Sequence, residues 1–317
     1  MRGVRREDGQ SLVFVIVAMT SFVLLMALVV DVGLWLQTQR KVQSVADAAA
    51  LAGVQSLPFN QPQADADARA YAQLNSRDAA IDSVDFPSGD TISVQASERV
   101  TGFFSSLAGI TSVTAKAHAA ARTGPAELLS NADLQKAGST VITPLVVNES
   151  AADCLPGCLG IDVTLRFDDA DHRGSELGVM CPGGCGSTGA SRNRLRGWIN
   201  CSPCLPGSFG PAGGTVDVAA APAGATNGGQ VRGALQRRVG TTVILPVFDD
   251  ANSASYHLAA FAAFVLDDVS WRNDSPSCRP DCKVVTGRFI TYRAPGALAS
   301  TDTGAPDYGV SVVGLTT

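Results

Sequence analysis

The sequence predicts an α+β protein in which a long N-terminal transmembrane helix is followed by an extracytoplasmic α/β unit and a disulfide-rich, mostly β second domain. Three observations lead to this fold class. Residues 12–30 contain no charged side chain, helix-type sequence continues beyond them to about residue 56, and all eight cysteines lie between residues 154 and 282. Only 17% of the residues are charged, against about 25% in typical soluble domains, so part of the chain is expected in lipid.

The chain divides into five expected segments. Its 317 residues allow two folded domains at about 150 residues each. Residues 1–11 are expected as a cytoplasmic tail and residues 12–36 as the transmembrane helix. Residues 37–122 are expected as a helical extension with a small α+β unit. Residues 123–295 are expected as a cysteine-rich, mostly β domain, and residues 296–317 as a polar tail.

The apolar run at residues 12–30 has the length of a membrane span. Nineteen uncharged residues cover about 30 Å as a helix, which matches the hydrocarbon core of a bilayer. A cleaved signal peptide is the alternative, because basic residues precede the run. However, signal peptides have apolar regions of about 7–15 residues, and no small-x-small cleavage site follows this run directly. We therefore predict an uncleaved anchor.

The basic residues beside the run predict its orientation. Arg2, Arg5 and Arg6 precede it, whereas Arg40 and Lys41 follow ten residues beyond it. Because basic residues favour the cytoplasmic side, this asymmetry predicts a single-pass protein of the cell membrane with its N-terminus in the cytoplasm. The bulk of the chain is then extracytoplasmic.

Two features near the outer end of the span are candidate contact sites. Asp31 is the first charge after the apolar run, and it is either an ordinary interface residue or a contact for a partner. Farther along, Val42, Val45, Ala49 and Ala52 share one narrow face of the helix. Such a face of small residues allows close packing, either on the protein's own domain or on another subunit.

Shorter elements are expected after the long helix. Prolines at 58 and 62 end it, a second helix follows at 63–74, and alternation predicts strands at 92–96 and 112–120. In the second domain the expected helices are 127–136 and 230–239, and the expected strands are 141–147, 161–167, 242–248, 256–266 and 284–292, with a further edge strand at 310–315. Residues 181–229 are rich in Gly, Pro and Ser and appear too poor in large apolar residues to build a core.

The cysteines form four close pairs, which have two interpretations. The pairs are Cys154 and Cys158, Cys181 and Cys185, Cys201 and Cys204, and Cys278 and Cys282. Outside the cytoplasm an even number of thiols is expected to oxidise, and turn residues between partners favour local disulfides. The alternative is zinc, because the second and third pairs are separated by fifteen residues, close to the spacing of a four-cysteine site.

The N-terminal region also resembles a known family. The run at 8–53 reads DGQSLVFVIVAMTSFVLLMALVVDVGLWLQTQRKVQSVADAAALAG, and it resembles the N-terminal signature of TadE/TadG-like Flp pilus-assembly proteins. The resemblance rests on residues 9–10, the apolar helix, residues 31–33 and the alanine-rich close at 46–52. It implies a single-span membrane protein of tight-adherence (Flp, type IVb) pili, similar to minor pilins or pseudopilins. It also implies that its partners are other pilus-assembly or pilin subunits.

The sequence departs from that family in two respects. A prepilin peptidase substrate would be cut after a glycine such as Gly9, with glutamate five residues later. Here that position is Phe14, which departs from the pattern, so Gly9 is a candidate processing site and cleavage after it stays open. Larger TadG-type proteins carry a metal-dependent adhesion motif, Asp-x-Ser-x-Ser. The nearest run here, at 268–272, ends in arginine, so we predict no metal site.

No catalytic constellation is present in the sequence. The chain lacks the nucleophile elbow, the zinc-protease helix motif, the P-loop and the dinucleotide fingerprint. It is therefore expected to be neither an enzyme nor dependent on a cofactor. A net charge of −5 without a basic run excludes a general nucleic-acid binder. We predict a membrane-anchored structural or assembly component of a Flp/Tad-type pilus. The alternative is a surface-displayed adhesion or ligand-binding module that uses the same anchor.

Overall fold

The computed structural model forms two compact units. The first comprises residues 1–122 and 314–317, and the second comprises residues 123–313. The structure describes residues 10–102, 104–105, 109–138, 140–155, 157–167, 176–183, 189–211, 215–222, 225–226, 229–252, 254–271, 283–298 and 306–316. The predicted class is confirmed, because a long apolar helix precedes sheet-rich chain with mixed helices and strands.

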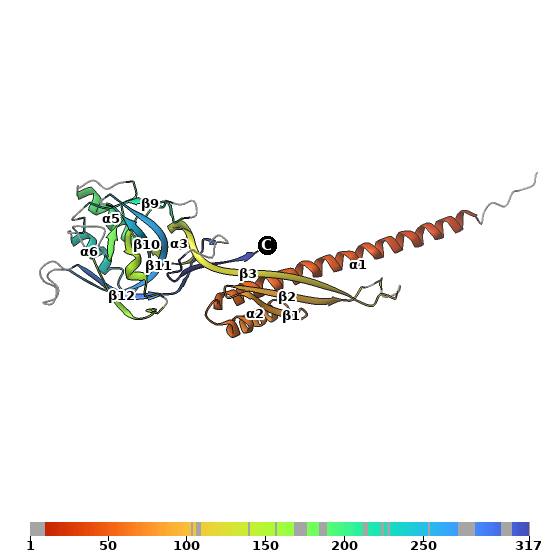
Figure 1. Cartoon of the computed structure of the whole chain (residues 1–317). Coiled ribbons are helices and arrows are strands. Elements are labelled where there is room, and N and C mark those ends of the chain that lie inside the picture. The colour runs from red at the N-terminus through yellow and green to blue at the C-terminus, as the bar shows by residue number, and fades with distance from the viewer. Residues whose placement is uncertain are drawn as a thin grey trace, which may run out of the picture. The chain divides into compact units, whose positions relative to one another are not determined.

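One continuous helix, α1 (Gln10–Gly53), begins the first unit (Figure 1). It contains no proline, and its outer half is rich in residues with high helix propensity. The last turn tightens into the 3₁₀ helix η1 (Val54–Ser56), and the chain then leaves the helix axis at Leu57 with an extended conformation. The expected helix at 10–56 is therefore observed as α1 followed by η1.

The second helix, α2 (Gln61–Asn75), packs against α1. The side chain of Asn60 accepts a hydrogen bond from the backbone N–H of Gln63 at 3.0 Å, which caps the helix start. Three alanines spaced by four residues are buried on one face, at positions 64, 68 and 72. Because alanine side chains are short, this face brings the two helix backbones close together.

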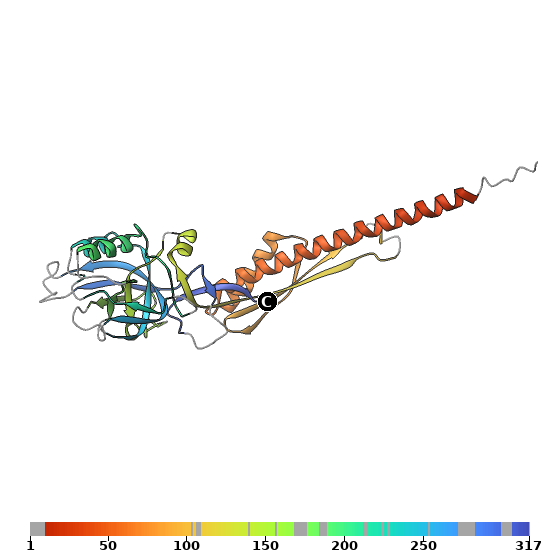
Figure 2. The same ribbon diagram turned by 90° about the horizontal axis from the view of Figure 1, so that it is seen from above.

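Three antiparallel strands follow α2: β1 (Ala80–Ser88), β2 (Thr91–Val100) and β3 (Val113–Ser130). The first unit contains β1, β2 and β3 up to residue 122, and the rest of β3 belongs to the second unit. Strand β1 is not among the strands expected from the sequence. Its pairing with β2 contains two irregularities, one of them near Pro87, which weakens any alternation in the sequence. Figures 1 and 2 show the β2–β3 hairpin running along α1 toward the N-terminal half of the helix.

The expected helix at 127–136 is wrong at its start. The strand β3 continues to Ser130, and the helix α3 (Asn131–Ala137) begins only there. The Ser130 side chain accepts from the backbone N–H of Asp133 at 3.2 Å and therefore acts as the N-cap. Pairing of Leu128 and Leu129 with other strands keeps the preceding residues extended.

An eight-stranded sheet forms the centre of the second unit. Its main path runs β6, β12, β11, β10, β5, β7, with β4 beside β10 and β9 beside β11. Neighbours are antiparallel, except that β10 pairs in parallel with β4 and β5. The strands are β4 (Val141–Ile142), β5 (Leu145–Asn148), β6 (Asp162–Arg166), β7 (Leu177–Val179), β9 (Asp217–Ala219), β10 (Thr242–Ala251), β11 (Ser255–Ser270) and β12 (Val284–Ile290). The expected strand at 141–147 is split at residues 143–144, where a proline interrupts the ladder.

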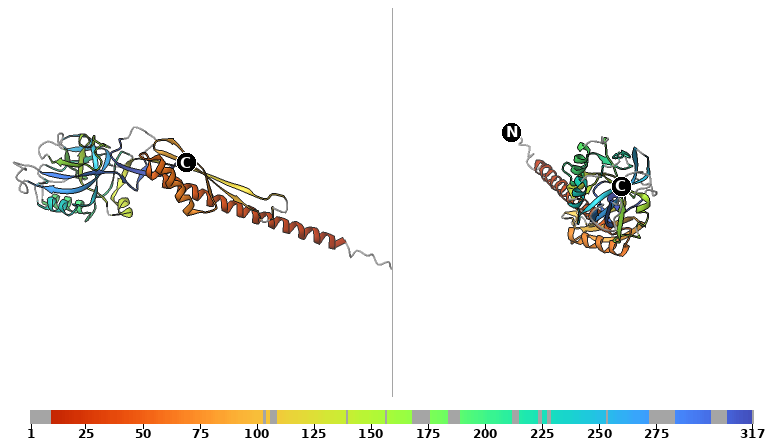
Figure 3. Two further views of the ribbon diagram at one scale, coloured as in Figure 1. Left: turned by 90° about the horizontal axis from the view of Figure 1, so that it is seen from below. Right: turned by 90° about the vertical axis from the view of Figure 1, so that its left-hand side faces the viewer.

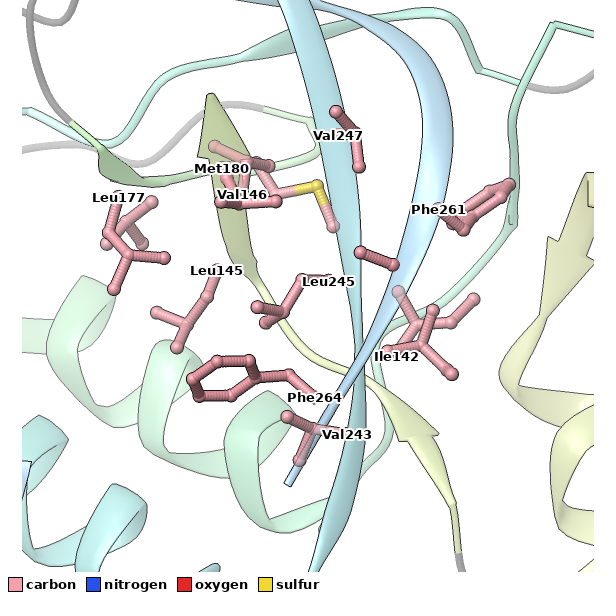
Figure 4. Close-up of a cluster of buried hydrophobic side chains, with 14 of the residues drawn as sticks. Ile142, Leu145, Val146, Leu177, Met180, Val243, Leu245, Val247, Phe261 and Phe264 are labelled. Carbon is pink, nitrogen blue, oxygen red and sulfur yellow. The ribbon is translucent and has the colours of Figure 1, made fainter. Parts of the chain in front are cut away.

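Large apolar side chains fill the core of the second unit, as the close-up in Figure 4 shows for one cluster on both sides of β10. Phe264 and Phe289 stack edge to face with their ring centroids 5.1 Å apart. Besides α3, the described part of this unit contains the helices α4 (Glu149–Ala152), α5 (Gly189–Asn200) and α6 (Gly229–Gln236).

Residues 181–229 were expected to be too poor in large apolar residues to build a core, but the structure places several of them in one. Helix α5 buries Leu195, Trp198 and Ile199, which lie at i, i+3 and i+4 of an otherwise polar helix. Phe209 in the short strand β8 (Ser208–Phe209) is also buried and pairs with β3. Few apolar residues are needed there, because each of them is placed on the inward face.

The C-terminal segment, expected as a polar tail over 296–317, contains two strands. They are β14 (Ala297–Leu298), which pairs with β3, and β15 (Val310–Thr316), which pairs in parallel with β13 (Tyr292–Arg293). Val310 and Val312 are buried in the core of the second unit. Alternation of apolar and small residues after Gly309 is the signal for this strand.

Candidate membrane anchor and packing face

Residues 12–26 of α1 carry an apolar surface that no described part of the chain covers. Side chains from residue 12 to residue 26 are all exposed, with Phe14 at 71% and Leu24 at 70%. Figure 3 (left) shows this part of α1 extending past the β2–β3 hairpin. Soluble monomers rarely expose such a continuous apolar surface. The helix is long and apolar enough to cross a membrane, and it therefore has the properties of a single membrane anchor.

The second half of α1 packs on the chain itself. Val42, Val45 and Ala49 are buried, Ala52 is half-buried, and α1 contacts both β2 and α2. The small-residue face predicted from the sequence thus lies on the protein's own sheet and second helix. Contact of this face with another subunit remains a prediction, and it would require α1 to move away from these elements.

Two glutamines of α1 bind the backbone of β3. Gln39 Nε2 donates to the carbonyl oxygen of Lys116 at 2.5 Å, and Gln43 Nε2 donates to that of His118 at 3.1 Å. Four residues along a helix and two residues along a strand both advance the chain by about 6–7 Å. Because these steps match, the two bonds fix the register between the helix and the strand.

Ion pairs also connect α1 with β2, and β3 with the turn between β1 and β2. Lys41 Nζ lies 3.1 Å from Glu98 on β2 and 3.3 Å from Asp78. The hydrogen bond to Glu98 raises the pKa of Lys41, against a smaller opposing effect of desolvation, and Asp78 adds to the increase. Arg122 on β3 pairs with Asp90 in the β1–β2 turn at 2.7 Å. The pair of Lys41 with Asp78 is exposed and should add little stability, whereas Glu98 and Arg122 are partly buried in their pairs.

Asp31 holds the loop that connects β2 with β3. Its carboxylate accepts backbone hydrogen bonds from Phe104 at 3.0 Å and from Ser105 at 2.6 Å. A Cβ atom added to Gly102 would collide first with the Ser105 side chain of the same loop and would lie 3.0 Å from Asp31 Oδ2, so the absence of a side chain leaves room for the loop to turn beside Asp31. Asp31 is therefore engaged by the chain's own backbone at the outer end of the apolar half of α1.

A second glycine allows α1, α2 and β2 to meet. A Cβ on Gly53 would lie 2.4 Å from the Ile92 side chain and 2.7 Å from the carbonyl oxygen of Ala64. The helix geometry at Gly53 is ordinary. The requirement for glycine there is therefore one of space, and it marks the closest approach of α1 to its neighbours.

Two of the predicted disulfides are described. Cys154 bonds to Cys158 with a Cα–Cα distance of 5.4 Å, and Cys201 bonds to Cys204. Cys181 is also disulfide-bonded, and no described cysteine is free. The remaining cysteines of the predicted pairs, at 185, 278 and 282, lie outside the described residues. Two of the four ligands in the zinc alternative are thus bonded to each other.

The two described histidines, His118 and His257, each contact one polar side chain and do not belong to a larger cluster of possible metal ligands. His257 Nδ1 lies 2.7 Å from Asp249 Oδ1, and the His118 ring is hydrogen-bonded to Ser93 at 2.9 Å. Among the residues that the structure describes, no group of three His, Cys, Asp or Glu side chains is placed to hold a metal ion. Gly9, the candidate processing position, lies outside the described residues.

Sequence reasoning missed the polar contacts between α1 and the hairpin. The glutamines at 39 and 43 are spaced by four residues, which places both on one helix face, but their acceptors are backbone carbonyls that the sequence does not identify. Likewise, Asp31 accepts hydrogen bonds from Phe104 and Ser105, which lie more than 70 positions away in the sequence. Only Gly102 and the uncharged loop around it hint at a close approach.

Residues 9–56 match the family model "Putative Flp pilus-assembly TadE/G-like". The match covers α1 and η1 and includes 48 of the 317 residues. It confirms the resemblance predicted from the N-terminal residues. No match was found among curated proteins. No solved structure matches the chain either.

Proposed function

We propose that this chain is a membrane-anchored, extracytoplasmic structural component of a Flp/Tad-type pilus, with a role in assembly or as a minor pilin-like subunit. One observation carries the proposal: the family match covers α1, and the two halves of this helix have different surroundings. One half is apolar and uncovered, whereas the other half is docked on a small α+β unit.

The proposed mechanism is mechanical. The free half of α1 inserts into the bilayer or packs against equivalent helices of other subunits, since both environments cover its apolar surface. The helix has no break between the free half and the docked half. A movement of the anchor is therefore transmitted directly to the unit that Gln39, Gln43 and the buried valines hold on the helix.

The proposed orientation places the N-terminus in the cytoplasm and both units outside it. The basic residues before the apolar run support this orientation through the preference of Lys and Arg for the cytoplasmic side. The bonds Cys154–Cys158 and Cys201–Cys204 support it as well, because structural disulfides persist in oxidising compartments.

Deletion of the gene in the bacterium that carries it tests the proposal. We expect loss or strong reduction of pili by electron microscopy, with recovery when the full chain is supplied. A chain with Leu24→Arg should fail to restore pili, because a charge at the centre of a span costs about 2.5–3.5 kcal/mol. The matched control is Ser44→Arg, which places the same side chain at an exposed position of the docked half.

Three results would contradict parts of the proposal. Normal pili in the deletion strain, with lost adhesion to one target, would support the adhesion module instead. Restoration by Leu24→Arg would show that the apolar half is not an anchor. N-terminal sequencing of the membrane-purified chain should find no cut after Gly9, because Phe14 occupies the position of the expected glutamate. An N-terminus at Gln10 would show that the chain is processed.

A further inference from the structure

Two described residues of the loop between β2 and β3, Phe104 and Ser105, are held at one level of α1. Asp31 accepts hydrogen bonds from the backbone of Phe104 and Ser105, at 3.0 and 2.6 Å. Asp31 is also the first charged residue after the apolar run at 12–30. If that run fills the hydrocarbon core, as the proposed function requires, the loop is held at the outer surface of the bilayer.

Apolar side chains are exposed at this end of the hairpin. Phe104 and Ile110 in the loop are 37% and 53% exposed, and Val113 at the start of β3 is 43% exposed. The backbone N–H of Ile110 donates to the carbonyl oxygen of Ser105 at 3.0 Å, so Ile110 lies beside the segment that Asp31 holds. On α1, Trp35 is also exposed within about one turn of Asp31. Tryptophan is enriched at membrane–water interfaces.

The charged residues nearest the loop lie on the strands that flank it, and not in the loop itself. No charged residue occurs between Arg99 and Lys116, and both of these basic side chains are exposed. Arg99 pairs across the hairpin with Thr114, next to the loop, and Lys116 pairs with Ser97, two residues farther from it. Glu98, between them on β2, is paired with Lys41. An apolar tip followed by basic residues fits the boundary between acyl chains and anionic headgroups.

We propose that the β2–β3 loop is a second membrane contact of this chain, formed with the lipid surface. Phe104, Ile110 and Val113 enter the boundary between headgroups and acyl chains beside α1. Asp31 acts as a positioning residue, because its carboxylate holds the loop at that depth. Contact at two points, the helix and the loop, limits rotation of the first unit about the axis of α1.

Depth-dependent quenching of tryptophan fluorescence tests this contact. The full chain is reconstituted into vesicles of phosphatidylcholine and phosphatidylglycerol whose acyl chains are either brominated or unmodified. Phe104→Trp is measured in a Trp35→Phe chain, and Trp35→Phe alone supplies the background from the two buried tryptophans. Phe59→Trp is the matched control, since Phe59 is exposed on the same unit but follows the distal end of α1. Ile110→Trp is a second, independent reporter.

We expect tryptophan at 104 and at 110 to be quenched by brominated lipid to an extent similar to Trp35 in the parent chain. Tryptophan at 59 should remain at background. Quenching of Trp35 without quenching at 104 and 110 would overturn the loop contact but leave the anchor intact. Absence of quenching at Trp35 itself would overturn both the anchor and the inference that depends on it.

A further substitution tests the role of Asp31. In the Phe104→Trp chain, Asp31→Ala should reduce the quenching, because the loop loses both hydrogen bonds to the helix. Asp31→Asn should restore part of it, since the amide retains one acceptor oxygen. Asp78→Ala removes an exposed carboxylate elsewhere on the same unit and should have no effect. Full quenching in Asp31→Ala would overturn the positioning role.

Discussion

The two compact units of this protein differ in the residues that fill their cores. In the first unit most buried side chains are alanine and valine, and its helices and sheet approach one another closely at Gly53. In the second unit the largest fully buried side chains include Tyr256, Phe248, Phe261 and Phe264. Disulfides occur in the second unit, whereas the first 153 residues contain no cysteine.

This difference shows two ways of stabilising a fold. Alanine buries little apolar area, so the first unit depends on close backbone approach and on polar contacts such as those of Gln39 and Gln43. Large side chains bury more area each, so the second unit depends on their volume. Substitutions that add volume should harm the first unit, and substitutions that remove volume should harm the second.

The largest effect is expected from Phe264→Ala in the second unit. Removal of this ring leaves a cavity beside Phe289 and should lower the free energy of unfolding by about 3–5 kcal/mol. The measurement is the guanidinium midpoint of the full chain in detergent, followed by the emission of Trp198 and Trp271 in a Trp35→Phe background. Phe59→Ala, at an exposed position of the first unit, should leave the midpoint unchanged. Equal effects of the two substitutions would contradict the inference that the second unit depends on the volume of its large buried side chains.

The next largest effect is expected from Gly53→Ala in the first unit. The added methyl group meets Ile92 and the backbone of Ala64, and such overpacking costs about 1–3 kcal/mol. Hydrogen exchange of the β2 amides in the full chain should become faster. Gly33→Ala is the matched control on the same helix, because nothing lies within 4 Å of a Cβ there. The control should have no effect or slow the exchange slightly.

A smaller effect is expected when the bond between Cys201 and Cys204 is removed by substitution of both residues with serine. The bond closes a loop of only four residues, so the entropy model allows at most about 2 kcal/mol. Hydrogen exchange should become faster in the second unit and remain unchanged in β2. Faster exchange in both units would show that the first unit also depends on this bond.

The smallest effect concerns pH. The hydrogen bond to Asp249 raises the pKa of His257 above its ordinary value of 6.5, against a smaller effect of desolvation, and Asp217 and Asp250 add to the increase. A raised pKa in the folded state adds stability that is fully present below pH 6.5 and is lost as the pH rises through the folded-state value. Because the side chain is 47% exposed, the contribution should stay below about 1 kcal/mol.

The pH effect is measured as the difference in unfolding midpoint between about pH 5 and about pH 8. The same difference is then measured for His257→Gln, which keeps a polar side chain without the titration. The part of the pH dependence that disappears in the variant belongs to His257. An unchanged pH dependence would show that the pair with Asp249 contributes nothing to stability.

Several elements were predictable because local signals and tertiary structure agree. The 44 residues of α1 contain no proline and carry a long apolar run, and nothing in the fold opposes the helix. Helix α2, expected at 63–74 after the proline break, is observed as Gln61–Asn75. In contrast, α5 was missed because its composition is mostly polar, although Leu195, Trp198 and Ile199 lie on one face.

The long apolar helix, the family resemblance at the N-terminus and the α+β class could all be predicted from the sequence. These depend on periodicity, composition and short motifs, which are properties of neighbouring residues. The contacts of Asp31 with Phe104 and Ser105, and the packing of Val42, Val45 and Ala49 on the protein's own elements, are seen only in the folded chain. Such contacts join residues far apart in the chain, and their partners are often backbone atoms, which every residue possesses and which no sequence pattern distinguishes.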